Sequence, residues 1–190
     1  TALLAEAFLL KHPSATIVYD LRASYAVRDT VLRYGGRPLM NRVGHAFIKR
    51  RMRDEDAIFG GEVTGHYYFR DNFYADNGFI PALLMLELMS KKNASLADLL
   101  KPMRAKYFIS GEINTKVASM SVLEDKLHAL ARQFSNGAVT KLDGVSVEYD
   151  DWHFNVRASN TEPLIRLNLE ATTPELMEKK RDEVLGVIRG

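Results

Sequence analysis

Hydrophobic and polar positions over residues 1–90 alternate between the periods of helices and strands. Apolar side chains recur at helical spacing over residues 2–11, and residues 16–20 form a short β-rich run that ends on an acid, typical of a buried parallel strand. The same patterns predict helices at 24–34, from 44 onward and at 78–90, and strands at 38–40, 57–60 and 67–69. Strands that alternate with helices indicate a parallel-rich α/β layer.

The order of elements changes beyond residue 105. We expect strands at 107–117, 138–142, 145–149, 153–156 and 164–169, and helices at 122–134 and 174–188. Asp143 and Gly144 form a hairpin dipeptide between two of these strands. This half therefore predicts an α+β unit with a largely antiparallel sheet. Between residues 92 and 103, Asn93, Ser95 and Pro102 interrupt short leucine turns, so we predict domains 1–105 and 106–190.

Composition excludes several classes of protein. The chain has 190 residues, of which 46% are hydrophobic and 26% charged, as in ordinary globular proteins with room for two small domains. A net charge of +2, spread along the chain, does not require a nucleic-acid partner. Zero cysteines exclude disulfides, a thiolate nucleophile and Cys-ligated zinc, and no apolar run approaches the roughly 20 residues of a membrane span. We expect a cytoplasmic protein without membrane contacts.

The chain begins in a helical pattern at residue 2 without an initiating Met. We therefore expect it to be part of a longer protein.

A polar loop at residues 60–66 follows an apolar strand, the position where ligands bind in parallel α/β sheets. Glu62 can accept protons from sugar hydroxyls, Thr64 can donate and accept, and His66 can donate to a hydroxyl or phosphate oxygen. The flanking glycines let the backbone approach a ligand closely. The same residues also fit a plain tight turn, with Glu62 solvated and His66 packed or capping.

A second loop at residues 157–163 combines a guanidinium, two hydroxyls and an amide between two predicted strands. Arg157 can bind phosphate through two parallel hydrogen bonds, and Ser159, Asn160 and Thr161 can occupy the remaining oxygens. The density of these groups favours a phosphate site. The alternative is a structural turn that ends at Pro163, with Arg157 in a surface ion pair.

Weaker signals lie at the ends of two earlier strands. Arg22 follows the strand at 16–20, and His45 opens a helix whose N-terminus favours anions. Arg22 also fits a solvated surface residue, and His45 a capping or packed one. The basic run 49–53 is better explained as a solvated helix face that pairs with the acids at 54–56. We interpret Met85, Leu86 and Met89 as core residues.

Together, residues 61–66, the Gly44-His45 pair with Lys49, and residues 157–163 resemble the sugar-binding and phosphate-binding loops of α-D-phosphohexomutases. Supporting stretches at 35–38, 75–78, 111–114 and 142–145 occur in the family's order. The resemblance covers essentially the whole chain. The residues of the two loops resemble those of the bacterial phosphomannomutase/phosphoglucomutase branch, with Thr64 in place of the usual serine.

The resemblance implies the third and fourth of four family domains: a mixed three-layer α/β domain followed by a TATA-binding-protein-like α+β domain. The implied partners are mannose or glucose 1- and 6-phosphates and the missing N-terminal domains. The family's catalytic phosphoserine loop and its Asp-rich magnesium loop are not found in this sequence. We therefore expect no catalytic or metal-binding residue in this chain and no turnover by the chain alone. In the intact enzyme the resemblance implies Mg²⁺ and a hexose 1,6-bisphosphate intermediate or activator.

The resemblance also implies roles for individual residues. Glu62 and Thr64 would hold the sugar hydroxyls in either orientation of the substrate. The phosphate that is not reacting would bind Arg157, Ser159, Asn160 and Thr161. Arg22, His45 and His66 match family positions near the active site. Two other functions are alternatives: a non-catalytic phosphosugar sensor or regulatory module, and nucleic-acid binding, which the lack of a basic face with stacking aromatics disfavours.

Overall fold

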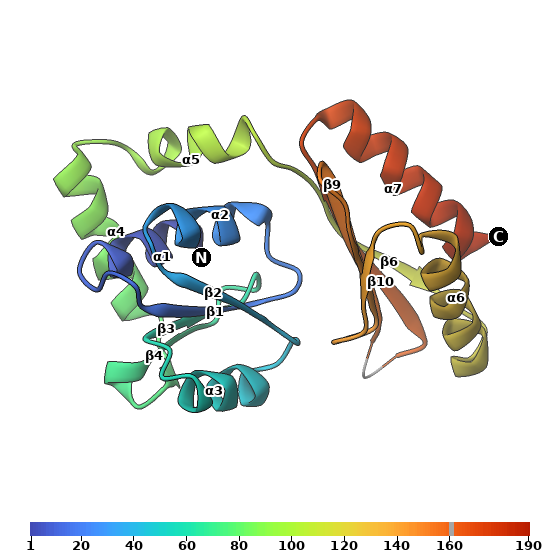
Figure 1. Ribbon diagram of the computed structural model, residues 1–190, viewed down its shortest axis with the longest axis horizontal. Helices are drawn as coiled ribbons and strands as arrows, with labels where there is room; N and C mark the ends of the chain where they lie inside the picture. The colour runs from blue at the N-terminus through green and yellow to red at the C-terminus, as the bar shows by residue number, and fades with distance from the viewer. Residues whose placement is uncertain (160–161) are drawn as a thin grey trace. The chain divides into compact units, whose positions relative to one another are not determined.

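The computed structural model describes residues 1–159 and 162–190. The chain forms two compact units, Thr1–Ala105 and Lys106–Gly190 (Figure 1).

Unit 1 is built on a five-stranded sheet with the order β2-β1-β3-β4-β5. β1 (Thr16–Asp20) pairs in parallel with β2 (Arg37–Asn41) and β3 (Phe59–Gly61). β4 (Tyr67–Phe69) and β5 (Ala75–Asp76) continue the sheet antiparallel to their neighbours. The sheet is mixed because helical crossovers join its parallel strands, whereas a short loop turns β3 directly back into β4.

Helices cover both faces of this sheet, which confirms the predicted α/β class. α1 (Ala2–Leu9) and α2 (Tyr25–Arg33) lie on one face, and α3 (His45–Asp54) lies on the other (Figure 1). On the α3 side, the buried Ile48 and Met52 pack against Val18 of β1. All five residues of β1 are buried, as expected for a central parallel strand covered on both sides.

α4 (Phe79–Lys92) packs against α1 with part of its apolar surface only. Leu88 is buried and Met85 and Met89 are half-buried, but Leu86 is 60% exposed. Our interpretation of this stripe as core is therefore wrong for Leu86, because consecutive apolar residues point in different directions around a helix.

Residues 92–103 are more regular than predicted, because α5 (Leu96–Arg104) occupies most of this stretch. Ser95 and Asp98 form a capping box: the Ser95 hydroxyl accepts from the Asp98 amide at 3.2 Å, and the Asp98 carboxylate accepts from the Ser95 amide at 3.3 Å. Pro102 lies inside the helix, near its end. The spacing of Ser95 and Asp98 already indicated a helix start, but Asn93 and Pro102 favoured an irregular segment.

Unit 2 is an antiparallel sheet with two helices, which confirms the predicted α+β class. Its strand order is β6-β10-β9-β8-β7. The strands are β6 (Phe108–Lys116), β7 (Ala138–Thr140), β8 (Val145–Glu148), β9 (Trp152–Ala158) and β10 (Leu164–Ala171). Gly144, with φ of +70°, forms the turn between β7 and β8. The core joins the sheet to α6 (Met120–Gln133) and α7 (Pro174–Arg189).

No helix in the ranges 1–159 and 162–190 is long and apolar enough to cross a membrane.

Candidate functional site

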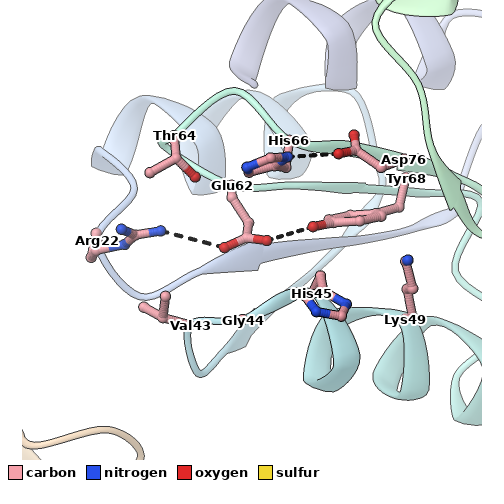
Figure 2. Close-up of a pocket in the computed structure, with 10 residues that line it drawn as sticks. All are labelled: Arg22, Val43, Gly44, His45, Lys49, Glu62, Thr64, His66, Tyr68 and Asp76. Carbon is pink, nitrogen blue, oxygen red and sulfur yellow. Dashed lines mark hydrogen bonds and ion pairs between the residues drawn. The ribbon is translucent and has the colours of Figure 1, made fainter. Parts of the chain in front are cut away.

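A pocket of about 330 Å³ opens in unit 1 where β1, β2 and β3 end (Figure 2). Parallel strands bring their carboxyl ends to one edge of a sheet, so the segments that follow these strands meet there. The lining residues are Arg22, Val43, Gly44, His45, Lys49, Glu62, Thr64, His66, Tyr68 and Asp76. The pocket therefore brings together all five site residues predicted from the sequence of this unit: Arg22, His45, Glu62, Thr64 and His66.

Arg22 is held by a buried acid at the end of β1. The Arg22 side chain is 4% exposed and that of Asp20 is 0% exposed. Arg22 donates from Nε to Asp20 Oδ1 at 3.0 Å and from Nη2 to Asp20 Oδ2 at 2.8 Å. Asp20 also accepts from the Val63 backbone amide at 2.8 Å. The alternative of a solvated surface arginine is wrong, because Asp20 draws the guanidinium into the pocket wall.

Glu62 is also buried and anchored. Tyr68 donates its hydroxyl to Glu62 Oε1 at 2.6 Å, and Arg22 Nη2 lies 3.5 Å from Glu62 Oε2 (Figure 2). Burial and the hydrogen bond to Glu62 raise the pKa of Tyr68. Gly65, with φ of +87°, closes the turn of the loop, and its amide donates to the Glu62 carbonyl at 3.1 Å. The alternative of a solvated Glu62 is wrong.

His66 faces Asp76 across the β4–β5 pair. His66 Nδ1 and Asp76 Oδ2 are 2.6 Å apart, and Asp76 Oδ1 accepts from the Tyr67 amide at 3.0 Å. Partial burial acts to raise the pKa of Asp76, but the hydrogen bonds from His66 and Tyr67 outweigh it and hold this pKa below its usual value. Because Nδ1 is engaged, the other ring nitrogen of His66 is the one that can meet a ligand. Thr64 is exposed at the tip of the same loop.

α3 contributes His45 and Lys49, which are one helical turn apart and share a face. The Lys49 ammonium lies 5.4 Å from the centre of the Tyr68 ring. Arg50 and Arg51 behave as the solvated face that the sequence suggested, with carboxylate partners Asp54 and Glu55 at 3.7 and 3.1 Å. Lys49, in contrast, lies on the side of α3 that lines the pocket.

Five residues of the pocket lining were not selected as site residues from the sequence: Val43, Gly44, Lys49, Tyr68 and Asp76. Lys49 was noted beside Gly44 and His45 in the family resemblance, and its spacing of four from His45 indicates that the two share a helix face. Tyr68 carries no local signal, and Asp76 was noted only within the stretch 75–78 of the resemblance. Strand pairing brings these two residues to Glu62 and His66.

The predicted phosphate-binding loop, residues 157–163, lies in unit 2. The prediction that Arg157 belongs to this loop is wrong, because Arg157 lies in β9. β9 extends through Ala158, which pairs with Ile165, because the antiparallel ladder continues past the predicted strand end. The Arg157 side chain is 7% exposed, and its Nη2 lies 3.1 Å from Glu112 Oε2. The alternative of a surface ion pair is therefore only partly right: Arg157 is buried, whereas the Glu112 side chain is 28% exposed.

Ser159 follows β9 directly and is also buried. Its hydroxyl accepts from Arg166 Nη2 at 3.2 Å, and Arg166 Nη1 reaches Glu112 Oε1 at 3.1 Å. Arg166 was not predicted from the sequence to lie near this segment. Asn160 and Thr161, the other two predicted phosphate ligands, lie outside the described residues.

Across the described part of the chain, no group of three or more His, Asp or Glu side chains is arranged to hold a metal ion.

Two family models match the chain in order. The phosphoglucomutase/phosphomannomutase alpha/beta/alpha domain III matches residues 1–107, and the C-terminal domain of the same family matches residues 112–187.

Similar proteins are phosphomannomutases that are longer than this chain. The phosphomannomutase of Escherichia coli is 46% identical over 190 residues, which cover 98% of this chain and 41% of that relative. The phosphomannomutase of Methanocaldococcus jannaschii is 39% identical and is matched over 99% of this chain and 41% of its own length. The chain thus spans about two fifths of the length of these relatives.

A solved phosphoglucomutase/phosphomannomutase family protein from Burkholderia thailandensis superposes with a TM-score of 0.81 at 30% identity, covering 99% of this chain and 40% of that one. A putative phosphomannomutase from Thermus thermophilus, at 21% identity and a TM-score of 0.72, shares the fold. This chain belongs to the phosphoglucomutase/phosphomannomutase family and carries that family's domain III and C-terminal domain.

Proposed function

We propose that this chain is the phosphosugar-binding part of a phosphomannomutase/phosphoglucomutase, an enzyme that interconverts hexose 1-phosphate and hexose 6-phosphate through a bisphosphorylated intermediate. The observation that carries the proposal is the unit 1 pocket, in which the buried carboxylate of Glu62 lies beside Thr64 and His66. A volume of about 330 Å³ suits a single sugar ring.

The proposed chemistry of the pocket is recognition of hydroxyl groups. An ionised Glu62 only accepts hydrogen bonds, so it suits the protons of sugar hydroxyls. Thr64 can donate or accept, and His66 can offer the ring nitrogen that does not face Asp76. Such mixed donors and acceptors would hold a hexose in two orientations, as the mutase reaction requires.

We assign the phosphate that is not reacting to the end of β9 in unit 2. Arg157 and Ser159 supply a guanidinium and a hydroxyl within three residues, and the sequence continues with Asn160 and Thr161. Phosphate would have to compete with Glu112 for Arg157, because the Glu112 carboxylate already lies 3.1 Å from the Arg157 guanidinium. A doubly charged phosphate attracts a guanidinium more strongly than one carboxylate does. Its binding energy would position the reacting end of the substrate.

Phosphoryl transfer itself is not assigned to this chain. Mg²⁺ would supply charge stabilisation at the transferring phosphate in the intact enzyme. The described residues do not fit a magnesium site, since their acids are not grouped as metal ligands. The proposed contribution of this chain is to bind and orient hexose phosphates and hexose 1,6-bisphosphate.

Calorimetric titration with mannose 1-phosphate and glucose 1-phosphate tests the proposal, with inorganic phosphate and free mannose as controls. We expect binding that is selective for the phosphosugars. Activity is tested by joining the chain to the first two domains of the Escherichia coli phosphomannomutase and measuring interconversion of mannose 1-phosphate and mannose 6-phosphate. A folded fusion that binds but does not interconvert them would favour the sensor function instead, and absence of both would overturn the proposal.

A further inference from the structure

Tyr68 lies in the wall of the pocket, next to Glu62. It is not among the residues to which the family resemblance gives a role. Its side chain is 0% exposed, and its hydroxyl donates to Glu62 Oε1 at 2.6 Å, the shortest of the contacts that Glu62 makes with pocket residues in Figure 2. A hydrogen bond this short to a carboxylate is strong, because the acceptor is charged.

The fold fixes where this hydroxyl lies. Tyr68 pairs with Gly60 of β3 and with Asp76 of β5, so its backbone is held on both sides. Its ring packs in the cluster formed by Val18, Ile48, Met52 and Ala57. Because neighbouring strand residues point to opposite faces, Tyr67 lies on the other side of the sheet, where its ring stacks on Phe59.

Glu62 is thereby held from two directions. Tyr68 engages Oε1, whereas Oε2 lies 3.5 Å from Arg22, which Asp20 holds in turn. A carboxylate has about four lone-pair positions, so these contacts leave room for ligand hydroxyls. A side chain fixed before binding loses little conformational entropy when the ligand arrives.

We propose that Tyr68 is a positioning residue that orients the Glu62 carboxylate so that its remaining lone pairs accept the hydroxyls of a hexose phosphate. This inference rests on the proposed function, because Glu62 must contact the sugar for its orientation to matter. It goes beyond that function by adding a residue that touches no substrate.

Replacing Tyr68 by phenylalanine removes only the hydroxyl. The ring stays in the core cluster and keeps its face toward Lys49, since phenylalanine also supports a cation–π contact. Tyr67→Phe is the matched control, because it makes the same chemical change one residue away, outside the pocket lining.

The test is calorimetric titration of both variants and the wild-type chain with mannose 1-phosphate. We expect Tyr68→Phe to bind about tenfold more weakly, the effect of one hydrogen bond to a charged group, and Tyr67→Phe to bind as the wild type does. A thermal unfolding curve of each variant reports whether it is folded.

A double-mutant cycle separates positioning from a general structural role. In a Glu62→Ala background, Tyr68→Phe should have no further effect on affinity, because the residue through which it acts is gone. An equal loss in both backgrounds would show that Tyr68 supports the pocket without acting through Glu62 and would overturn the inference.

A measurement on the wild-type chain covers the case in which Tyr68→Phe does not fold. With tyrosine labelled at Cζ with ¹³C, mannose 1-phosphate should shift the Tyr68 resonance more than that of Tyr67. No shift at Tyr68 in a chain that binds the sugar phosphate would overturn the inference. Equal affinity of a folded Tyr68→Phe variant would do the same and leave the proposed function intact, whereas absence of binding by the wild type would overturn both.

Discussion

Lys92 on α4 forms an ion pair with the carboxylate of Glu6, which lies buried on α1. The hydroxyl of Tyr34, at the end of α2, donates to the same carboxylate at 2.8 Å. One buried acid therefore joins α1, the end of α2 and α4 in unit 1.

Lys92→Ala should destabilise the chain by about 1–3 kcal/mol, because Glu6 would remain buried without its cation. Lys92 is partly exposed, so we expect less than for a fully buried pair. Urea unfolding measures the effect. Lys91→Ala is the control: Lys91 is 64% exposed and pairs with Glu87 at the surface, so its removal should change stability by less than about 0.5 kcal/mol. Equal effects of the two changes would contradict the role of Glu6.

Stability should fall at alkaline pH in a way that two tyrosines control. Burial first, and hydrogen bonds to Glu6 and Glu62 second, raise the pKa values of Tyr34 and Tyr68 above 10.0 in the folded state. The unfolded chain loses these protons first, so the contribution to stability is complete below pH 10 and declines above it. Urea unfolding at about pH 9 and about pH 11 should show a smaller decline in Tyr34→Phe and Tyr68→Phe than in the wild type. An unchanged decline in both variants would contradict this assignment.

Phe73→Asn should stabilise the chain by about 0.5–1 kcal/mol, because Phe73 is held in the left-handed region, which asparagine tolerates better. Its φ is +56° and its side chain is 89% exposed, so little packing is lost with the ring. Thermal unfolding measures the gain. Phe79→Asn is the control, since Phe79 is similarly exposed at 83% but lies at the start of α4, and should bring no gain.

Arg157→Ala should weaken phosphosugar binding by about 2–3 kcal/mol, the scale of a charged, hydrogen-bonded contact. Calorimetric titration with mannose 1-phosphate measures the loss. Arg181→Ala is the control in the same unit, because Arg181 pairs with its neighbour Asp182 on α7. If Arg157→Ala binds as tightly as the wild type, the segment at the end of β9 has a structural role only.

Local sequence signals were enough to locate most helices and strands. The helix predicted at 24–34 corresponds to α2, whose N-cap is Ser24 and whose C-cap is Tyr34, because capping and glycine punctuation depend on nearby residues only. The hairpin at Asp143-Gly144 follows from the left-handed conformation that glycine adopts there. Five candidate site residues of unit 1 were likewise found from their positions after predicted strands.

Only the tertiary structure decided which side chains hold those residues in place. Asp20 meets the Glu62 loop, and Tyr68 meets Glu62, through pairing of strands whose partners the sequence does not name. The same reason explains the position of Arg157 within β9 and its contact with Glu112 of β6, which lies 45 residues away in the chain. Local patterns determined the elements and the candidate ligands, whereas strand register, a long-range property, determined their burial and partners.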